Sequence, residues 1–419
     1  MMTNFKDASI LHMADLHIED DPWTLGHLKK AASIILPILQ AEKPSLIVIA
    51  GDYFHKNLPL DSEGTRFAID FLRNLSFHAP ILILEGTETH DRKSLDVLSS
   101  VQTSNPVTFV TEPSIVSFPG IPGLEDCDFY CMPGIKKKSF KPIAERYGLD
   151  LLKTSPGDLA AYQFQKWAED QLCRPGRDAV FVGHIQLGLG GLEKMTTGYE
   201  PIISPATIEF IKPSLGLLGH VHDLISHGKY HYSGNLVPKT MIESEIVSIS
   251  DDLQVKTERS APRKGFYIHK RLPEGGTWQN VFHPVETVRF CQILVRAENE
   301  ANLATKMEVA HQYLKTQGEG SDRGNVVCKF DVETPDPTVS DALFRQENII
   351  RESMGKGMEI VSPSINVTSF SQHAARVEDE SAWRKKDPRN KFFDWRARRG
   401  YERNEAEERE LSDKIAMVL

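Results

Sequence analysis

The sequence predicts a layered α/β protein in which two sheets are flanked by helices, followed by a small α/β cap domain and a helical C-terminal tail. In the first part of the chain, short apolar runs alternate with amphipathic helical patterns, which favours an α/β architecture over an all-β one. A second, smaller α/β pattern begins near Thr287, and the residues from about Ser371 onward are densely charged.

The strands of the first domain are expected where runs are apolar on both faces, as in sheets buried between helices. These runs are Ser9–Ala14, Leu46–Ala50, Ile81–Leu84, Ala179–Val182 and Leu215–Leu218. A first helix is predicted to open at Asp21-Pro22, an N-cap followed by proline at the first helical position, and a second to follow Ser62. Tyr230–Ser233 and Gly265–Lys270 are expected as strands that close this domain.

Three units are predicted: a catalytic domain over 1–275, a cap domain over 284–368 and a charged helical tail over 369–419. Pro273 and the pair Gly275-Gly276 indicate a linker within Arg271–His283. The cap is expected to alternate strand and helix. Its elements are Phe290–Arg296, Asn302–Thr316, Val326–Val332, Ser340–Ser353 and Met358–Val361.

The tail interleaves aromatic and basic residues in Trp383–Lys386 and Phe392–Arg399. This pattern is typical of a partner-docking helix or a nucleic-acid contact. A solvated helix packed back on its own chain is the alternative.

Composition limits the class of protein. The formal charge of −9 opposes non-specific nucleic-acid binding, although the sum averages over local patches and over carboxylates that hold metals. The five cysteines are scattered without CxxC spacing, which argues against a disulfide framework and a thiolate zinc site. The chain has neither a run of roughly 20 apolar residues nor an apolar signal segment, so we expect a cytoplasmic protein without membrane contact.

Polar residues follow the apolar runs, where an α/β sheet places its ligands. They form five short motifs in order, namely Asp15-Leu16-His17, Gly51-Asp52, Gly86–Asp91, Gly183-His184 and Gly219-His220-Val221-His222. Each motif alone is a weak signal, because such histidines are usually structural. Five such motifs in order, each at the end of an apolar run, together predict one metal-binding pocket.

Carboxylates and neutral imidazoles suit Mn, Fe or Zn better than Mg. Residues two apart on an extended segment point to the same side, so Asp15 with His17, and His220 with His222, can converge. Two ions roughly 3.5–4 Å apart can polarise a phosphoryl oxygen and activate water, and a carboxylate usually bridges them. Asp52 is the expected bridge.

The order of these motifs resembles the signature of calcineurin-like metallophosphoesterases over roughly the first half of the chain. Within that class the sequence is most similar to SbcD-type DNA exonuclease subunits. The stretches that carry this similarity are Gly51–His55 with Asn57 and Pro59, Tyr232–Asn235, and Lys264-Gly265-Phe266.

The resemblance implies a role for each matching position. Asp15, His17, Asp52 and His222 would hold one metal, and Asp52, His184 and His220 the other. His90 would stabilise or protonate the scissile phosphate and leaving oxygen, and His55 would act on duplex ends, unless it is a plain surface residue. Where the family has Gly-Asn-His, this turn is longer and has Thr89 before His90. Thr89 is therefore the expected neutral ligand of the second metal, with Glu88 as a stronger, charged alternative. A different oxygen of the Thr87–His90 turn is a third possibility.

The leading hypothesis is a Mn²⁺-dependent DNA nuclease, a 3′–5′ exonuclease on duplex ends and a single-strand endonuclease, within an SbcCD-like repair and recombination complex. The resemblance implies DNA, an SbcC-type SMC-like ATPase and a second copy of the chain as partners. One alternative is a phosphoesterase for a small phosphodiester or nucleotide. Another is a non-catalytic regulatory protein whose metal site has decayed.

Overall fold

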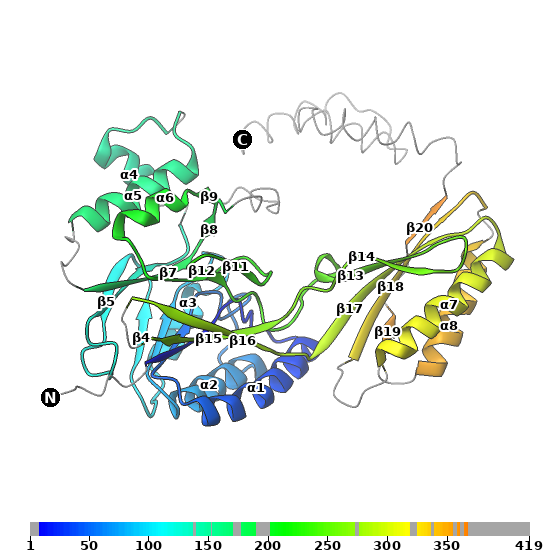
Figure 1. Ribbon diagram of the computed structural model, residues 1–419, viewed down its shortest axis with the longest axis horizontal. Helices are drawn as coiled ribbons and strands as arrows, with labels where there is room; N and C mark the ends of the chain where they lie inside the picture. Colours follow the sequence, from blue (N-terminus) through cyan, green and yellow to red (C-terminus); the bar gives the residue numbers. More distant parts are fainter. Residues whose placement is uncertain are drawn as a thin grey trace.

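The described part of the chain contains three six-stranded sheets, and Figure 1 shows two of them stacked in one half of the molecule and the third at the other end. The computed structural model describes residues 8–136, 140–151, 153–170, 177–189, 202–272, 276–318, 325–336, 339–354, 358–360 and 364–367. A two-stranded ribbon of β8 (Gln186–Leu187) and β9 (Ile202–Ile203) lies beside the second sheet.

The first sheet has the strand order β16-β15-β1-β2-β3-β4. Its strands are β1 (Ser9–Met13), β2 (Leu46–Ile49), β3 (Ile81–Leu84), β4 (Val107–Val110), β15 (Gly265–Arg271) and β16 (Trp278–Pro284). The strands β1 to β4 pair in parallel, whereas β15 and β16 form an antiparallel edge. Parallel pairing brings the carboxyl ends of β1, β2 and β3 to one edge of the sheet.

The second sheet has the order β11-β12-β10-β7-β6-β5. Its strands are β5 (Ser114–Ser117), β6 (Cys127–Met132), β7 (Asp178–His184), β10 (Leu215–Gly219), β11 (Ile225–His227) and β12 (Tyr230–Tyr232). Here β6, β7, β10 and β12 are parallel and the two edge strands are antiparallel. The carboxyl ends of β7 and β10 therefore also share one edge.

Capping residues fix the starts of the first two helices, as the sequence predicted. The Asp21 carboxylate accepts a hydrogen bond of 2.8 Å from the backbone N of Thr24, and Pro22 opens α1 (Pro22–Glu42). The Ser62 hydroxyl accepts one of 3.1 Å from the backbone N of Thr65 at the start of α2 (Glu63–Ser76). Each bond satisfies one of the backbone donors that a helix start leaves without a partner.

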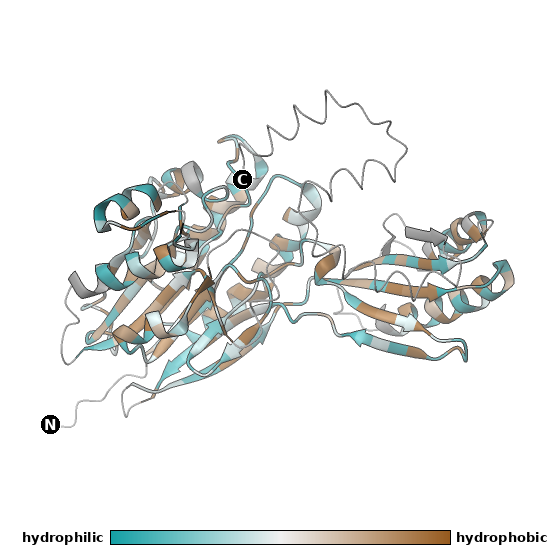
Figure 2. Cartoon of the chain, turned by 90° about the horizontal axis from the view of Figure 1, so that it is seen from above, coloured by the Kyte–Doolittle hydropathy of each residue, from teal (hydrophilic) through white to brown (hydrophobic). Residues whose placement is uncertain are grey.

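Helices cover both outer faces of the two stacked sheets. The helices α1, α2 and α3 (Arg92–Ser99) pack on the first sheet, and α5 (Pro156–Asp170) and α6 (Pro205–Ile208) pack on the second, with α4 (Phe140–Tyr147) beside α5. A separate core lies between the sheets. In Figure 2 the sheet strands are hydrophobic over much of their length, as expected for strands buried on both faces. This confirms the predicted two-sheet sandwich flanked by helices.

The third sheet has the order β14-β13-β17-β18-β19, with β20 also paired to β18. Its strands are β13 (Glu245–Ile249), β14 (Val255–Arg259), β17 (Val288–Arg296), β18 (Asn325–Thr334), β19 (Met358–Ile360) and β20 (Ser364–Val367). One face packs on α7 (Glu300–Gly318) and α8 (Val339–Met354). The elements expected for the small α/β unit from 284 onward are present with ends that differ by a few residues.

The structure differs from the sequence expectation around the linker. Trp278–Pro284 is not a connecting coil but the edge strand β16, paired with β15 along its whole length. The expected linker Arg271–His283 therefore overlaps an antiparallel pair of strands, and Pro273 itself lies outside the described residues. In addition, β13 and β14 precede residue 275 and yet belong to the third sheet, where β13 pairs with β17 and β14 forms the edge. The division into domains at 275 and 284 stays a prediction.

The charged tail over 369–419 lies outside the described residues. Among the helices that the structure describes, none combines the length and the apolar character that crossing a membrane requires.

Candidate metal centre

The loops that follow five strands meet at one edge of the stacked sheets. Asp15 and His17 follow β1, Asp52 follows β2, and His184 ends β7. Backbone hydrogen bonds join the first two loops: the N of Asp15 donates to the O of Gly51 at 3.0 Å, and the N of His17 donates to the O of Asp52 at 2.9 Å. The loop after β1 is therefore a continuation of the sheet pairing, which fixes where its side chains point.

Four of the predicted ligands have a left-handed backbone. Asp15, His17, Asp52 and His220 have φ of +53°, +47°, +51° and +90°. Such conformations cost non-glycine residues on the order of 1–3 kcal/mol each and persist where the surroundings enforce them. Their concentration at these loops is typical of a functional site.

Glycines allow the loops to approach each other closely. A Cβ atom on Gly51 would lie 2.2 Å from Nδ1 of His184, and one on Gly86 would lie 2.0 Å from Oδ1 of Asp52. Neither position has room for a side chain, so the glycines in these motifs are required by the packing of the predicted ligands.

One half of the centre joins the loops after β1 and β10. Asp15, His17 and His222 each offer a ligand atom, and these atoms lie within 4.8 Å of one another. The Nε2 atoms of His17 and His222 are only 2.9 Å apart. Two imidazole nitrogens at this distance are arranged like neighbouring ligands of one ion.

The other half joins Asp15, Asp52 and His184, whose ligand atoms also lie within 4.8 Å of one another. Nδ1 of His184 donates to the backbone O of Ala50 at 2.8 Å, which leaves Nε2 free to bind a metal. Oδ2 of Asp52 lies 3.4 Å from Nε2 of His184 and 3.7 Å from Nε2 of His17. Asp52 thus lies between the two halves, where a bridging carboxylate is expected.

The turn after β3 presents Thr87, and not Thr89, to this second half. Oγ1 of Thr87 is 3.3 Å from Oδ2 of Asp52 and 3.3 Å from Nε2 of His184. Its backbone N also donates to Oδ1 of Asp52 at 2.6 Å. Thr89 is exposed. The longer turn therefore brings its first threonine, directly after Gly86, to the position for which Thr89 was expected.

His220 lies at the same edge. Its backbone N donates to both carboxylate oxygens of Asp15 at 3.0 Å, and its ring centroid is 5.3 Å from that of His184. The ring is thus on the His184 side of the centre, and its role as a ligand of the second ion stays a prediction.

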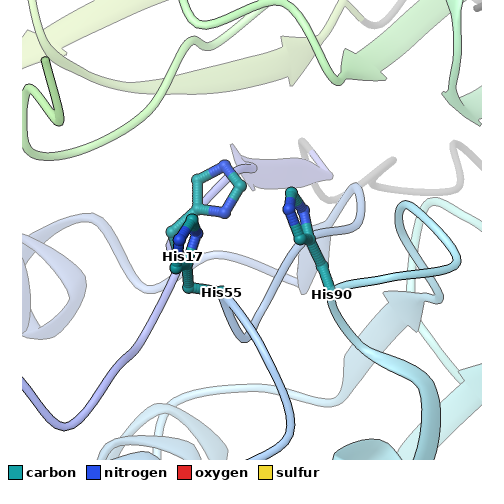
Figure 3. A group of neighbouring side chains, drawn as sticks. All are labelled: His17, His55 and His90. Atoms are coloured by element: carbon teal, nitrogen blue, oxygen red, sulfur yellow. The ribbon is translucent and has the colours of Figure 1, made fainter. Parts of the chain in front are cut away.

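Three imidazoles form a further cluster that shares His17 with the centre. His17, His55 and His90 come from the loops after β1, β2 and β3, and Figure 3 shows their rings gathered together. Nδ1 of His90 is 2.7 Å from Oδ2 of Asp52, and its ring centroid is 5.3 Å from that of His55. His55 is half-buried beside the other two rings and is not an isolated surface residue.

A family model for calcineurin-like phosphoesterases matches residues 8–224, which is more than half of the chain. The chain belongs to the calcineurin-like phosphoesterase family. The matched residues of this phosphoesterase include every residue predicted as a ligand or as a catalytic histidine. Membership implies hydrolysis of phosphoesters with divalent metal ions.

This phosphoesterase is also similar to the D component of the nuclease SbcCD from Staphylococcus saprophyticus. The two are 21% identical over 325 residues, which cover 72% of this chain and 75% of that protein. The similarity is therefore longer than the family match and extends beyond residue 224.

The charges in the phosphoesterase centre also fit bound cations. Burial opposes ionisation of Asp52, but His184, His90 and His17 outweigh it and hold the pKa of Asp52 well below its ordinary value. Burial likewise opposes protonation of His184, yet Asp52 raises its pKa to about 10. Asp15 and Asp52 are 1% and 2% exposed. Two buried carboxylates need positive charge close by, and divalent ions would supply it.

Asp91, the last residue of the Gly86–Asp91 motif, had no predicted role. In the structure it connects two of the loops that carry the centre. Its carboxylate accepts hydrogen bonds from the backbone N of Phe54 at 2.8 Å and of Gly86 at 2.7 Å. Burial, with the nearby charge of Asp52, raises its pKa to about 7. Asp91 thus joins the loops after β2 and β3. Its place directly after His90 was the only signal for this role in the sequence.

Proposed function

We propose that this phosphoesterase is a Mn²⁺-dependent DNA nuclease of the SbcD type. It would act as a 3′–5′ exonuclease on duplex ends and as a single-strand endonuclease in an SbcCD-like complex for DNA repair and recombination. The observation that carries the proposal is the convergence of two ligand groups on Asp15 and Asp52. The similarity to a component of the SbcCD nuclease beyond residue 224 favours this substrate class over others in the family.

In this proposal Asp15, His17, Asp52 and His222 hold one ion, and Asp52, Thr87, His184 and His220 hold the other. The mixture of carboxylate and imidazole ligands suits Mn²⁺. Bound divalent ions would polarise the scissile phosphate and lower the pKa of water that attacks it. Thr87 takes the role first expected of Thr89, because its hydroxyl lies 3.3 Å from both Asp52 and His184.

His90 and His55 are proposed to act on the substrate. The bond of 2.7 Å between Nδ1 of His90 and Asp52 fixes the ring, so Nε2 can donate to an oxygen of the scissile phosphate or to the leaving oxygen. The His90 side chain is 24% exposed, so DNA can reach it. His55, adjacent to His90, is proposed to contact the end of a duplex.

The remaining parts are proposed to bind partners. The cap, predicted over 284–368, would contact DNA, and the tail over 369–419 would dock on an SbcC-type SMC-like ATPase. A second copy of the chain would bind through helices of the catalytic domain. A cytoplasmic location remains part of this proposal.

The test compares two substrates with purified protein in Mn²⁺: linear duplex DNA and a small chromogenic phosphodiester. We expect digestion of the duplex from its ends and loss of that digestion in Asp52→Asn. Turnover of the small diester without cleavage of DNA would favour the alternative of a small-molecule phosphoesterase. Failure of the parent protein to cleave either substrate would favour the non-catalytic regulatory protein.

A further inference from the structure

The two ring nitrogens of His222 face different partners. Nε2 lies 2.9 Å from Nε2 of His17, on the side where the proposed ion binds. Nδ1 lies 3.6 Å from Oε1 of Glu243, which ends a short 3-10 helix (Met241–Glu243) just before β13. A metal-binding histidine commonly presents its second nitrogen to a carboxylate, which fixes the tautomer and the ring orientation.

Three donors hold the Glu243 carboxylate in place. Oε2 accepts hydrogen bonds from Nζ of Lys264 at 2.5 Å and from Nδ2 of Asn235 at 2.9 Å. Oε1 accepts one of 3.0 Å from the backbone N of Lys239. Glu243, Lys264 and Asn235 are 8%, 7% and 0% exposed. A buried carboxylate with this many donors is both ionised and rigid.

Lys264 also holds the main chain of the same histidine. Its Nζ donates to the backbone O of His222 at 3.0 Å. The ring and the carbonyl of His222 are therefore tied to one buried cluster, defined here as Glu243, Lys264 and Asn235. Lys264 belongs to the Lys-Gly-Phe stretch noted in the sequence, where the structure gives its side chain this contact.

Two other histidines of the centre differ from His222 in what their second ring nitrogen contacts. Nδ1 of His184 donates to a neutral carbonyl, that of Ala50. Nδ1 of His17 is buried without a hydrogen-bond partner among the described residues. Of these three ligands, only His222 has a carboxylate at its second nitrogen. A charged acceptor makes an imidazole a stronger ligand than a neutral acceptor does.

We propose that Glu243 is a positioning residue that commits Nε2 of His222 to the ion on the Asp15–His17 side, and that Lys264 holds Glu243 in place for this task. The inference rests on the proposed metal centre and adds an asymmetry to it. Loss of the Glu243 charge should lower the affinity for this ion by about 10- to 100-fold. The ion on the His184 side should be unaffected, because its histidine has a separate support.

The test is a Mn²⁺ titration of the metal-free protein, followed by the electron paramagnetic resonance signal of free Mn²⁺. We expect the parent to bind two equivalents and Glu243→Gln to bind one with the parent affinity and one about 10- to 100-fold more weakly. The matched control is Glu245→Gln. Glu245 is also a buried carboxylate, but its partners are Arg289 at 2.7 Å and the Tyr313 hydroxyl at 2.8 Å, and not a histidine of the centre. This control should titrate like the parent.

Each outcome decides a different claim. If the parent binds two ions and Glu243→Gln titrates identically, or if both ions weaken equally, the positioning role is overturned while the metal centre stands. A parent that binds no Mn²⁺ overturns the centre and this inference together. If Glu243→Gln does not fold, the Zn²⁺-loaded parent decides instead: its long-range ¹H–¹⁵N spectrum should show His222 protonated at Nδ1, and protonation at Nε2 would overturn the role.

Discussion

Nδ1 of His90 lies 2.7 Å from Oδ2 of Asp52, so the proposed substrate donor and the proposed bridging carboxylate are directly joined. This bond orients the His90 ring, whereas Asp52 is also held by the backbone N of Thr87, which donates to its Oδ1 at 2.6 Å. The two functions can therefore be separated by mutation.

His90→Asn should remove the donor and leave the metal centre intact. We expect the rate of duplex cleavage to fall by about 10²- to 10⁴-fold, the usual contribution of a positioned acid or base. The Mn²⁺ stoichiometry should equal that of the parent, and His227→Asn, at an exposed position, should cleave at the parent rate. A variant that cleaves at the parent rate would remove His90 from the mechanism.

Asp52→Asn should weaken the binding of both ions and abolish cleavage, because the bridging charge is lost from both halves. Metal analysis after dialysis should find at least one ion fewer than in the parent. The thermal midpoint of the metal-free variant should show that it is folded. Full retention of two ions would contradict the place of Asp52 between them.

Thr87→Val and Thr89→Val form a matched pair in one turn. The first removes the hydroxyl that lies 3.3 Å from Asp52 and His184. It should therefore lower the affinity for one Mn²⁺ ion and raise the Mn²⁺ concentration needed for cleavage. The second changes an exposed side chain and should leave both unchanged. The reverse result would return the ligand role to Thr89.

Acid stability should depend on three histidines buried between the sheets, His12, His231 and His269. Burial lowers the pKa of His231 to about 4 and of His269 to about 3, and that of His12 lies well below its ordinary value. Between about pH 6.5 and 4 the unfolded chain binds protons that the folded chain does not, so the free energy of unfolding falls as the pH falls.

His231→Gln removes one of these groups. Urea denaturation between pH 7 and 4 should show a slope of unfolding free energy against pH smaller by up to about 1.4 kcal/mol per pH unit. The exposed His227→Gln serves as the control. An unchanged slope in His231→Gln would show that His231 titrates normally in the folded protein.

Much of the fold, and the grouping of several candidate site residues, could be predicted because they depend on short sequence patterns. Asp21-Pro22 and Ser62 are capping signals that depend on a few neighbouring residues. Asp15, Asp52 and His184 stand at the ends of apolar runs, and parallel pairing alone brings such ends together.

The remainder depended on contacts that local pattern does not encode. The backbone path of the Gly86–Asp91 turn decides which of its threonines reaches Asp52. A turn has no repeating sequence pattern from which this path could be predicted. Glu243 lies well after His222 in the chain and meets it only through the loop before β13. The edge strand β16 resembled a linker because proline and glycine precede it in the sequence.

The central claim is that Asp15 and Asp52 bring two divalent ions into one pocket. Anomalous diffraction from a crystal soaked in Mn²⁺ measures this directly. The account predicts two peaks, one beside His17 and His222 and one beside His184 and Thr87, both in contact with Asp52. Absence of both peaks, or peaks only at other residues, would contradict it.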